Sequence, residues 1–281
     1  MPTLKAAGLD VALTERGEGP GLPVVCVHST GLSALQWRRL IRRLSKAHRV
    51  IAPDLIGYGG TPTWPGPQPF ETRFDLEIVR ACIDRAGPGP VHLVGHSYGG
   101  RLVILAAAER PEQVASIACF EPVSFGVLRS TGEREGIEEL LAYNDDGLFL
   151  DDSFGGSRAW VERFVDYWNG KGSFADMSER EQDLFCASGR KMFEEVRETS
   201  NDQVPHTHYT SLACPCLFVS GSQSTRAGRQ TARVLARELP AGRHIEIDAG
   251  HMAPLTASME VNALFLDHIA AAEAQRDSSD R

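Results

Sequence analysis

The chain has 281 residues, 42% hydrophobic and 23% charged, with a formal net charge of −8. Such a composition supplies a sizeable core and suits one α/β domain that carries an insertion. The acidic balance argues against a nucleic-acid partner, because phosphate binding needs clustered Lys and Arg. No apolar run is long enough to cross a bilayer and the N-terminus has no cleavage-like segment, which predicts a cytoplasmic protein without a membrane partner.

Strand-like apolar runs alternate with amphipathic segments along the chain. An opening hairpin is predicted over residues 4–13, with its turn near residues 17–21. Further strands are predicted at 23–28, 49–55, 91–96, 116–122, 216–221 and 244–248, and helices at 33–46, 70–86, 101–108, 225–239 and 258–272. This alternation predicts a mostly parallel sheet with helices on both faces.

Between about residues 123 and 209 the pattern becomes helical and polar. Three amphipathic segments, 132–143, 157–168 and 178–199, are predicted there, with no convincing strand. The block interrupts the strand–helix rhythm, so it is predicted to be an insertion between two parts of one core, residues 1–122 and 210–272. Residues 273–281 are polar and are predicted to form a flexible tail.

Six cysteines are present, and three of them, Cys26, Cys119 and Cys216, lie inside strand-like runs. This placement suits small buried side chains better than a disulfide framework. Cys214 and Cys216 flank a single proline, which is not the CxxC spacing of a metal site. The sequence therefore predicts a reduced protein without a metal ion.

The stretch Gly95-His96-Ser97-Tyr98-Gly99 connects a short apolar run to an Ala- and Leu-rich helix. Glycine lacks a Cβ, so the chain can turn sharply there while the apex residue takes a strained conformation that exposes its hydroxyl. The N-terminus of the following helix can face developing negative charge. Ser97 is the candidate nucleophile, and a serine that only caps the helix is the alternative.

Four motifs occur in an order that resembles the α/β-hydrolase superfamily over nearly the whole chain. They are His28-Ser29-Thr30-Gly31, Asp54-Leu55-Ile56-Gly57-Tyr58-Gly59, the turn at 95–100 and Ala249-Gly250-His251-Met252-Ala253-Pro254. The resemblance implies an eight-stranded, mostly parallel α/β-hydrolase sheet and a helical cap formed by residues 123–209. It implies no metal and no organic cofactor.

His251 is the candidate base. It follows a strand in a loop that contains Gly250, so it could reach across the carboxyl edge of the sheet to Ser97. The alternative is a histidine that caps the final helix. His28 and His96 are expected to brace the loops beside the serine.

Two backbone N–H groups are expected to form an oxyanion hole. The resemblance implies one donor on the residue after the nucleophile, Tyr98, and another on the loop that follows the strand at 23–28. By position the second donor is Thr30 in preference to Ser29.

The orienting acid departs from the family pattern. Relatives commonly carry an Asp shortly after the sixth core strand, but Ser224 stands there, and a serine cannot carry the charge that stabilises an imidazolium. Glu121 is the preferred substitute, because it ends the strand that should lie beside the nucleophile's strand and ionised Glu is seldom buried unpaired. Some relatives place the acid at this strand end. The alternative is a Glu paired with an arginine, and weaker candidates for the acid are Asp145, Asp146 and Asp248.

Aromatic side chains are frequent on the elements that should border the cleft, which favours an apolar or aromatic substrate. At helical spacing such residues more often form the core of a small lid than the wall of a binding site. The predicted substrate contacts are Trp37, Phe125, Trp160, Phe164, Trp168 and Met252, and Tyr58, Tyr98 and Tyr167 border the same cleft.

These residues predict a serine hydrolase that cleaves a carboxylic ester, a lactone or a related acyl compound through an acyl-enzyme on Ser97. The same apparatus serves C–C bond hydrolysis, thioester cleavage or perhydrolysis. A non-catalytic ligand-binding member of the fold, or a lyase or cyclase that uses His251 as a proton shuttle, stays open because fold does not dictate function. The expected partner is a small acyl compound, and a homodimer is left open.

Overall fold

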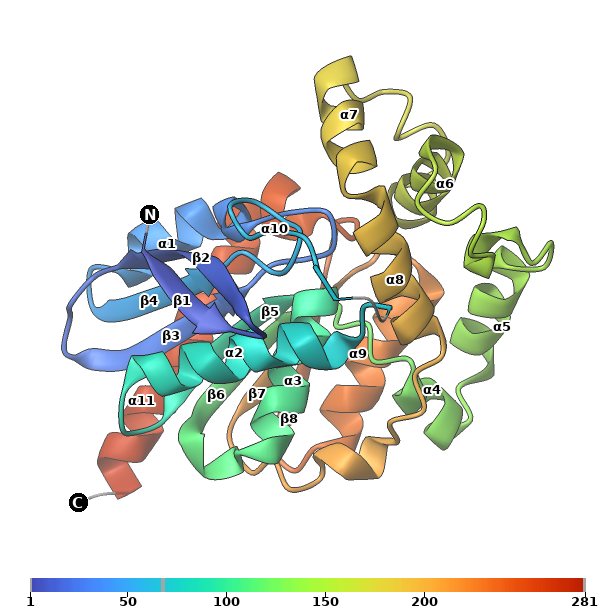
Figure 1. The fold of residues 1–281 in the computed structure, drawn as a ribbon. Helices are drawn as coiled ribbons and strands as arrows, with labels where there is room; N and C mark the ends of the chain where they lie inside the picture. The colour runs from blue at the N-terminus through green and yellow to red at the C-terminus, as the bar shows by residue number, and fades with distance from the viewer. Residues whose placement is uncertain (1, 67–68, 280–281) are drawn as a thin grey trace.

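A computed structural model describes residues 2–66 and 69–279 (Figure 1). Within this range eight strands form one sheet in the order β1-β2-β4-β3-β5-β6-β7-β8. β1 pairs with β2, and β2 with β4, in antiparallel fashion, whereas the pairs from β4 to β8 are parallel. The strands are β1 (Thr3–Ala6), β2 (Leu9–Arg16), β3 (Gly21–Val27), β4 (His48–Pro53), β5 (Val91–His96), β6 (Val114–Phe120), β7 (Cys216–Gly221) and β8 (Gly242–Ile247).

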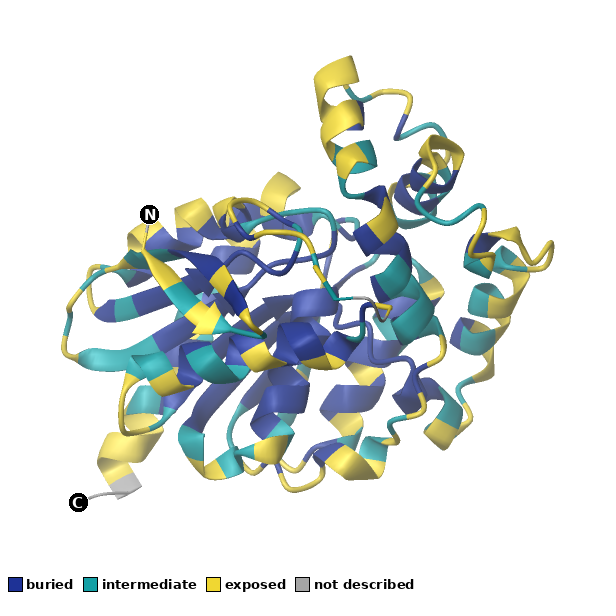
Figure 2. Ribbon diagram, viewed as in Figure 1, coloured by how far each residue is buried: buried dark blue, intermediate teal, exposed yellow. Residues whose placement is uncertain are grey.

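Helices cover both faces of this sheet, and the apolar side chains under them form two separate clusters. Successive residues of β3 belong to different clusters, Val25 and Val27 to one and Val24 and Cys26 to the other, because side chains alternate along a strand. The inner strands β4, β5, β6 and β7 are almost wholly buried and appear dark blue in Figure 2, whereas β1 at the edge is largely exposed. One face carries α2 (Thr72–Ala86), α3 (Tyr98–Glu109) and α9 (Arg226–Glu238), and the other carries α1 (Arg38–Leu44), α10 (Ala253–Thr256) and α11 (Ser258–Ser279).

Five helices lie between β6 and β7 and stand beside the carboxyl ends of the parallel strands (Figure 1). We call them the β6–β7 helices. They are α4 (Gly126–Thr131), α5 (Arg134–Tyr143), α6 (Arg158–Asn169), α7 (Glu179–Ala187) and α8 (Gly189–Ser200). The single helix expected at 178–199 is therefore two helices that meet at Ser188. At the junction α8 packs closely on a loop, since a Cβ on Gly189 would lie 2.4 Å from the Gly156 carbonyl oxygen.

An aromatic core holds the β6–β7 helices together. Trp160 is fully buried, stacks on Phe149 and Phe164, and meets Phe193 edge-on, while its indole N–H donates to the Phe149 carbonyl. The prediction that Trp160 contacts substrate is therefore wrong, because its ring is buried between the helices and packs against other aromatic rings.

Three other sequence predictions need correction. The first hairpin turns at Ala7 and Gly8, which both have positive φ, and not near residues 17–21, which connect β2 to β3. Residues 273–279 do not form a separate tail, since they continue α11, and the Glu273 carboxylate accepts a hydrogen bond from the Leu22 N–H; residues 280–281 lie outside the described range. Trp37 is buried against Phe265 on the face of the sheet that carries α1 and α11, so it does not border the cleft.

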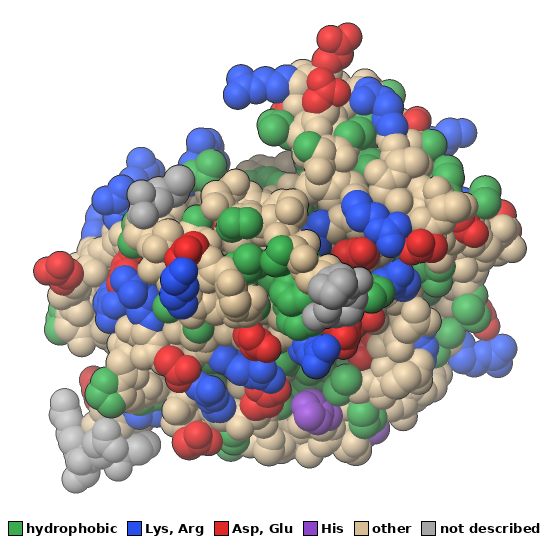
Figure 3. Space-filling view, viewed as in Figure 1, with side chains coloured by type: hydrophobic (Ala, Val, Ile, Leu, Met, Phe, Trp, Pro, Cys, Tyr) green, Lys and Arg blue, Asp and Glu red, His purple; other side chains and the backbone are tan. Residues whose placement is uncertain are grey.

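Two surface properties bear on partners. In the described part of the chain no helix is both long and apolar enough to span a membrane. On the face drawn in Figure 3, Lys and Arg side chains are interspersed with Asp and Glu. Such a mixture creates no extended field of one sign on that face.

His92 on β5 makes the stability of the fold dependent on pH. The ring is completely buried, its Nδ1 lies 2.7 Å from Ser116 Oγ, and burial lowers its pKa to about 4. The unfolded chain, in which a histidine has its ordinary pKa near 6.5, binds this proton first, so the free energy of unfolding should fall as the pH drops from 6.5 to 4. We expect this one group to account for about 3 kcal/mol of that loss.

Urea unfolding of His92→Gln and of the exposed-site control His208→Gln at several pH values tests this prediction. His92→Gln should flatten the dependence between pH 6.5 and 4, and His208→Gln should retain it. An unchanged slope in His92→Gln would show that the buried ring is already protonated in the native state.

Candidate active site

Ser97 occupies the sharp turn between β5 and α3. Its backbone has φ 53° and ψ −117°, a strained conformation for a residue with a side chain. Gly99 permits the turn, because a Cβ there would lie 2.4 Å from the carbonyl oxygens of Val27 and His28. The Ser97 N–H donates to the Phe120 carbonyl at 2.9 Å, which ties the turn to the end of β6.

Glu121 and His251 form a buried pair at the carboxyl edge of the sheet. The His251 Nδ1 lies 2.5 Å from Glu121 Oε2, and their side chains are 3% and 0% exposed. Glu121 directly follows β6 and also has a positive φ of 41°, so the two neighbouring strands β5 and β6 both end in a strained residue. An ionised carboxylate only accepts hydrogen bonds, so this contact favours the tautomer of the neutral ring that has its proton on Nδ1 and its lone pair on Nε2.

Ser224 stands where relatives commonly carry the acid, and its side chain binds Glu121, the carboxylate that takes the place of that acid. Its hydroxyl donates to Glu121 Oε2 at 2.6 Å, and the Gly221 N–H donates to Oε1 at 2.8 Å. One donor from the end of β7 and one from the loop after it therefore hold a carboxylate that directly follows β6. That Ser224 lacks the charge of an acid could be read from the sequence. Its hydrogen bond to Glu121 could not, because only the pairing of β6 with β7 brings the two residues together.

His251 is held on two further sides. Its carbonyl oxygen lies 2.9 Å from His96 Nε2, and His96 Nδ1 lies 3.0 Å from the Gln36 amide. Burial lowers the pKa of His96 well below its usual value, which keeps this brace neutral. The Trp168 ring stacks on the imidazole with centroids 4.0 Å apart.

In the described residues the Ser97 hydroxyl makes no hydrogen bond to His251, although both residues line one cavity. Such catalytic hydrogen bonds often form only when substrate binds.

The loop after β3 brings the backbone of Ser29 and Thr30 to the cavity that Ser97 lines. The Ser29 N–H donates to Gln36 Oε1 at 3.0 Å, so it is occupied, and this favours Thr30 as the sequence predicts. The Tyr98 N–H belongs to the first turn of α3, where backbone amides have no partner within the helix. His28 braces this loop, because its Nε2 accepts the Leu55 N–H at 2.9 Å.

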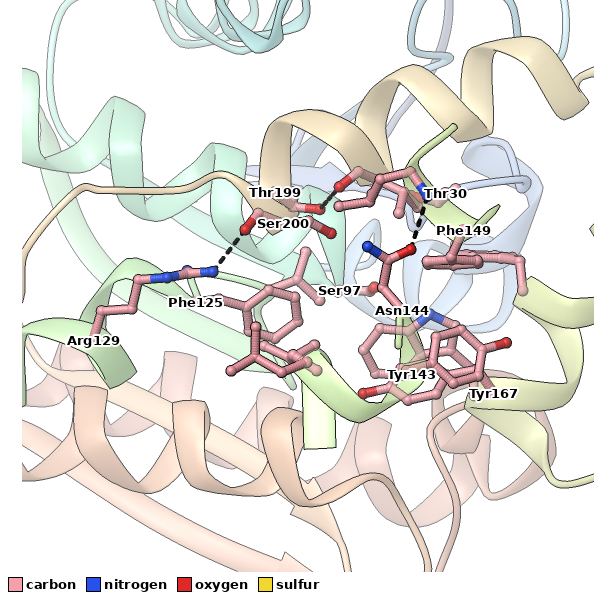
Figure 4. A pocket seen from close by; sticks show the side chains of 17 residues that line it. Thr30, Ser97, Phe125, Arg129, Tyr143, Asn144, Phe149, Tyr167, Thr199 and Ser200 are labelled. Carbon is pink, nitrogen blue, oxygen red and sulfur yellow. Dashed lines mark hydrogen bonds between the residues drawn. The ribbon is translucent and has the colours of Figure 1, made fainter. Parts of the chain in front are cut away.

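Two cavities meet at Ser97. The larger one has a volume of about 140 Å³ and extends among the β6–β7 helices (Figure 4). The smaller one, about 70 Å³, lies on the side of His251. Thr30, Ser97, Phe164 and Trp168 line both of them.

Four of the six predicted substrate contacts line these cavities. Phe125 lines the larger cavity, Met252 the smaller, and Phe164 and Trp168 both. Trp37 and Trp160 lie elsewhere, as described above. Residues of the larger cavity that sequence analysis did not single out include Arg129, Asn144, Phe149, Thr199 and Ser200. Of these residues, Arg129 could have been suspected from the order of motifs, because it lies on the first helix after Glu121.

Two of the weaker candidates for the acid, Asp248 and Asp146, have other partners. Asp248 is exposed and accepts from Ser222 Oγ and Gln223 Nε2, and Asp146 pairs with Arg163. In the described residues no group of three or more His, Cys, Asp or Glu side chains is arranged to hold a metal ion. The geometry thus joins a serine, a histidine and a glutamate at the edge of one apolar cleft.

Comparison with known proteins agrees with this fold. A family model described as the alpha/beta hydrolase fold matches residues 23–258. The chain is 24% identical over 249 residues to (E)-2-((N-methylformamido)methylene)succinate hydrolase from Acinetobacter baylyi, a match that covers 87% of this chain and 89% of that protein. It is 34% identical over 129 residues to the lipase LipV from Mycobacterium tuberculosis, which covers 45% of this chain and only 47% of that protein.

Solved structures show the same architecture. The enol-lactonase from Burkholderia xenovorans LB400 matches with a TM-score of 0.71 at 19% identity, covering 96% of this chain and all of that chain. A putative lipase from Acinetobacter baumannii matches with a TM-score of 0.77 at 18% identity, covering 97% and 91%. Because the family model spans most of the chain and the sheet has the matching topology, the protein belongs to the alpha/beta hydrolase fold family.

Proposed function

We propose that the protein is a serine hydrolase that cleaves a carboxylic ester, a lactone or a related acyl compound. Ser97 acts as the nucleophile, His251 as the base, and Glu121 as the acid that orients His251. The observation that carries the proposal is the 2.5 Å contact between Glu121 and His251 beside a cavity that Ser97 also lines.

The reaction proceeds in two halves. Ser97 Oγ attacks the carbonyl carbon while His251 Nε2 takes the hydroxyl proton, and the N–H groups of Thr30 and Tyr98 donate to the oxyanion. His251 then gives this proton to the leaving group, and the acyl group stays on Ser97. A water molecule, deprotonated by His251, attacks the acyl carbon; the bond to Ser97 Oγ then breaks, His251 returns the proton to Oγ, and the carboxylic acid is released.

The two cavities suggest where the two parts of an acyl substrate, the acyl group and the leaving group, would bind. His251 protonates the leaving group, so the smaller cavity beside it suits the leaving group and the larger cavity suits the acyl arm. Both walls are largely apolar, which favours an apolar or aromatic substrate. We also propose that residues 123–209 act as a cap, because α6 contributes Phe164 and Trp168 to both cavities.

The alternatives differ in what they require of Ser97. A C–C bond hydrolase, thioesterase or perhydrolase would use the same residues, and only a substrate screen separates them. The ligand-binding alternative rested on the missing charge at Ser224, and Glu121 offers a carboxylate to His251 in its place. A lyase or cyclase would keep substantial activity without the serine hydroxyl.

Intact mass after exposure to a fluorophosphonate probe tests the proposal. We expect one adduct on the wild type and none on Ser97→Ala or His251→Ala, because the probe needs an activated serine. Labelling of Ser97→Ala would contradict the assignment of the nucleophile. Absence of any adduct on folded wild type would favour the ligand-binding or proton-shuttle alternative.

A further inference from the structure

Arg129 is the only charged residue among those that line the larger cavity in the described chain. It lies on α4, and Figure 4 shows its guanidinium at one end of the cavity beside Ser200, with Phe125 on the way to Ser97. The other lining residues are apolar or uncharged. Arg129 is half-buried, and its positive charge stands alone in an otherwise uncharged lining, in a protein of net charge −8.

The Arg129 guanidinium has neutral partners within the protein. Its Nη1 donates to the Asp202 carbonyl oxygen at 3.0 Å and its Nη2 to the Ser200 carbonyl oxygen at 2.7 Å. Three other arginines of the β6–β7 helices each pair with a carboxylate: Arg134 with Glu138, Arg163 with Asp146, and Arg190 with Asp152. In the described residues Arg129 has no such pair.

The adjacent Asp202 carboxylate is committed elsewhere. Its Oδ2 accepts from the buried Arg101 and from the Gly126 N–H at 2.9 Å, and its Oδ1 accepts from the Val204 N–H at 3.0 Å. Arg101 and Asp202 thus neutralise each other. Asp202 therefore does not neutralise Arg129.

We infer that the acyl arm of the substrate ends in a carboxylate, which binds Arg129. The inference rests on the proposed acyl transfer at Ser97 and adds the chemical class of the acyl group, a monoester of a dicarboxylic acid with an apolar spacer along Phe125. A guanidinium has five N–H donors, so two bonds to carbonyls leave donors for a carboxylate. Because the smaller cavity is walled by Phe164, Met177, Phe185 and Met252, the alcohol of the ester is apolar.

Matched substrates test the inference in the wild type without any variant. Monomethyl esters of dicarboxylic acids from succinate to pimelate are compared with the methyl esters of the corresponding monoamides, which have the same shape and no charge. Methanol release is followed by NMR. We expect kcat/KM to favour the charged ester by roughly 10- to 100-fold at the best chain length, because hydrogen bonds to charged groups are the strong ones. Equal kcat/KM at every length would overturn the inference.

Variants assign the preference to one side chain. Arg129→Met should bring the charged-to-neutral ratio of kcat/KM close to one, and Arg134→Met, which removes an exposed charge from α5, should leave the ratio intact. A ratio that survives in Arg129→Met would place the carboxylate elsewhere.

A binding measurement separates the inference from the proposed function. Calorimetry of Ser97→Ala with the dicarboxylate products requires no turnover, and binding should be lost when Arg129→Met is added. If Ser97→Ala binds the dicarboxylates but the wild type neither hydrolyses esters nor reacts with the fluorophosphonate, the Arg129 site is supported and the acyl transfer is rejected. Ester hydrolysis by the wild type without a preference for the charged ester would support the acyl transfer and reject the Arg129 site.

Discussion

The Glu121→Gln variant is expected to lose about 10³- to 10⁴-fold in kcat while keeping its fold. The Gly221 N–H donates to Glu121 Oε1, so the glutamine keeps its carbonyl oxygen there and turns its NH₂ group toward His251. That group donates to Nδ1 and holds the imidazole proton on Nε2, where the Ser97 proton has to go. Hydrolysis of an ester that the wild type accepts, with circular dichroism to check the fold, measures the loss.

Two further variants make this result specific. Ser224→Ala removes one donor to Glu121 but leaves the pair with His251 intact, so we expect a loss of only about tenfold, as for a single hydrogen bond. Asp248→Asn alters an exposed carboxyl with other partners and should leave kcat unchanged. Full turnover in Glu121→Gln together with its loss in Asp248→Asn would move the acid to Asp248.

The Lys191→Met variant should lose about 3–5 kcal/mol in free energy of unfolding, because it leaves buried carboxylates without their cation. Lys191 on α8 donates to Asp75 on α2 at 2.8 Å and to Glu195, and all three side chains are buried. Burial alone would lower the pKa of Lys191, but the two carboxylates outweigh it and raise the pKa. Urea unfolding at pH 7 measures the effect.

The neighbouring residue offers a matched control. Arg190 is half exposed and pairs with Asp152 and Glu194 at the surface, so Arg190→Met should cost less than about 1 kcal/mol. In Lys191→Met the stranded carboxylates can take up protons that the unfolded chain does not hold, so the deficit should shrink between pH 7 and 5. A deficit that stays constant with pH would mean that lost packing, not charge, is responsible.

The order of motifs predicted the fold and much of the candidate site. The strand before Ser97, the helix after it and the strand that ends at Glu121 are local patterns of apolar and small residues, so they could be recognised directly. The position of Glu121 at the end of the strand beside the nucleophile's strand followed from one rule, that consecutive parallel strands in such a chain tend to be neighbours.

What the sequence could not provide depends on contacts between distant segments. Trp37 and Trp160 have the residue type of a binding wall, but the face that each presents is decided by packing against Phe265 and Phe193. The helix at 178–199 breaks where a loop approaches Gly189, and the C-terminal residues stay helical beyond 272. The role of Ser224 depends on a carboxylate 103 residues away.

The neighbouring positions of Ser97 and Glu121 on β5 and β6 also affect how the protein matures. Ser97 and Glu121 are synthesised early and come together as soon as two consecutive strands pair, whereas His251 lies 130 residues after Glu121. The donors that hold Glu121, Gly221 and Ser224, also come from the late part of the chain. Under the proposed mechanism Ser97 therefore lacks its base until the segment that carries His251 docks on the sheet, so we expect hydrolysis to begin only late in folding.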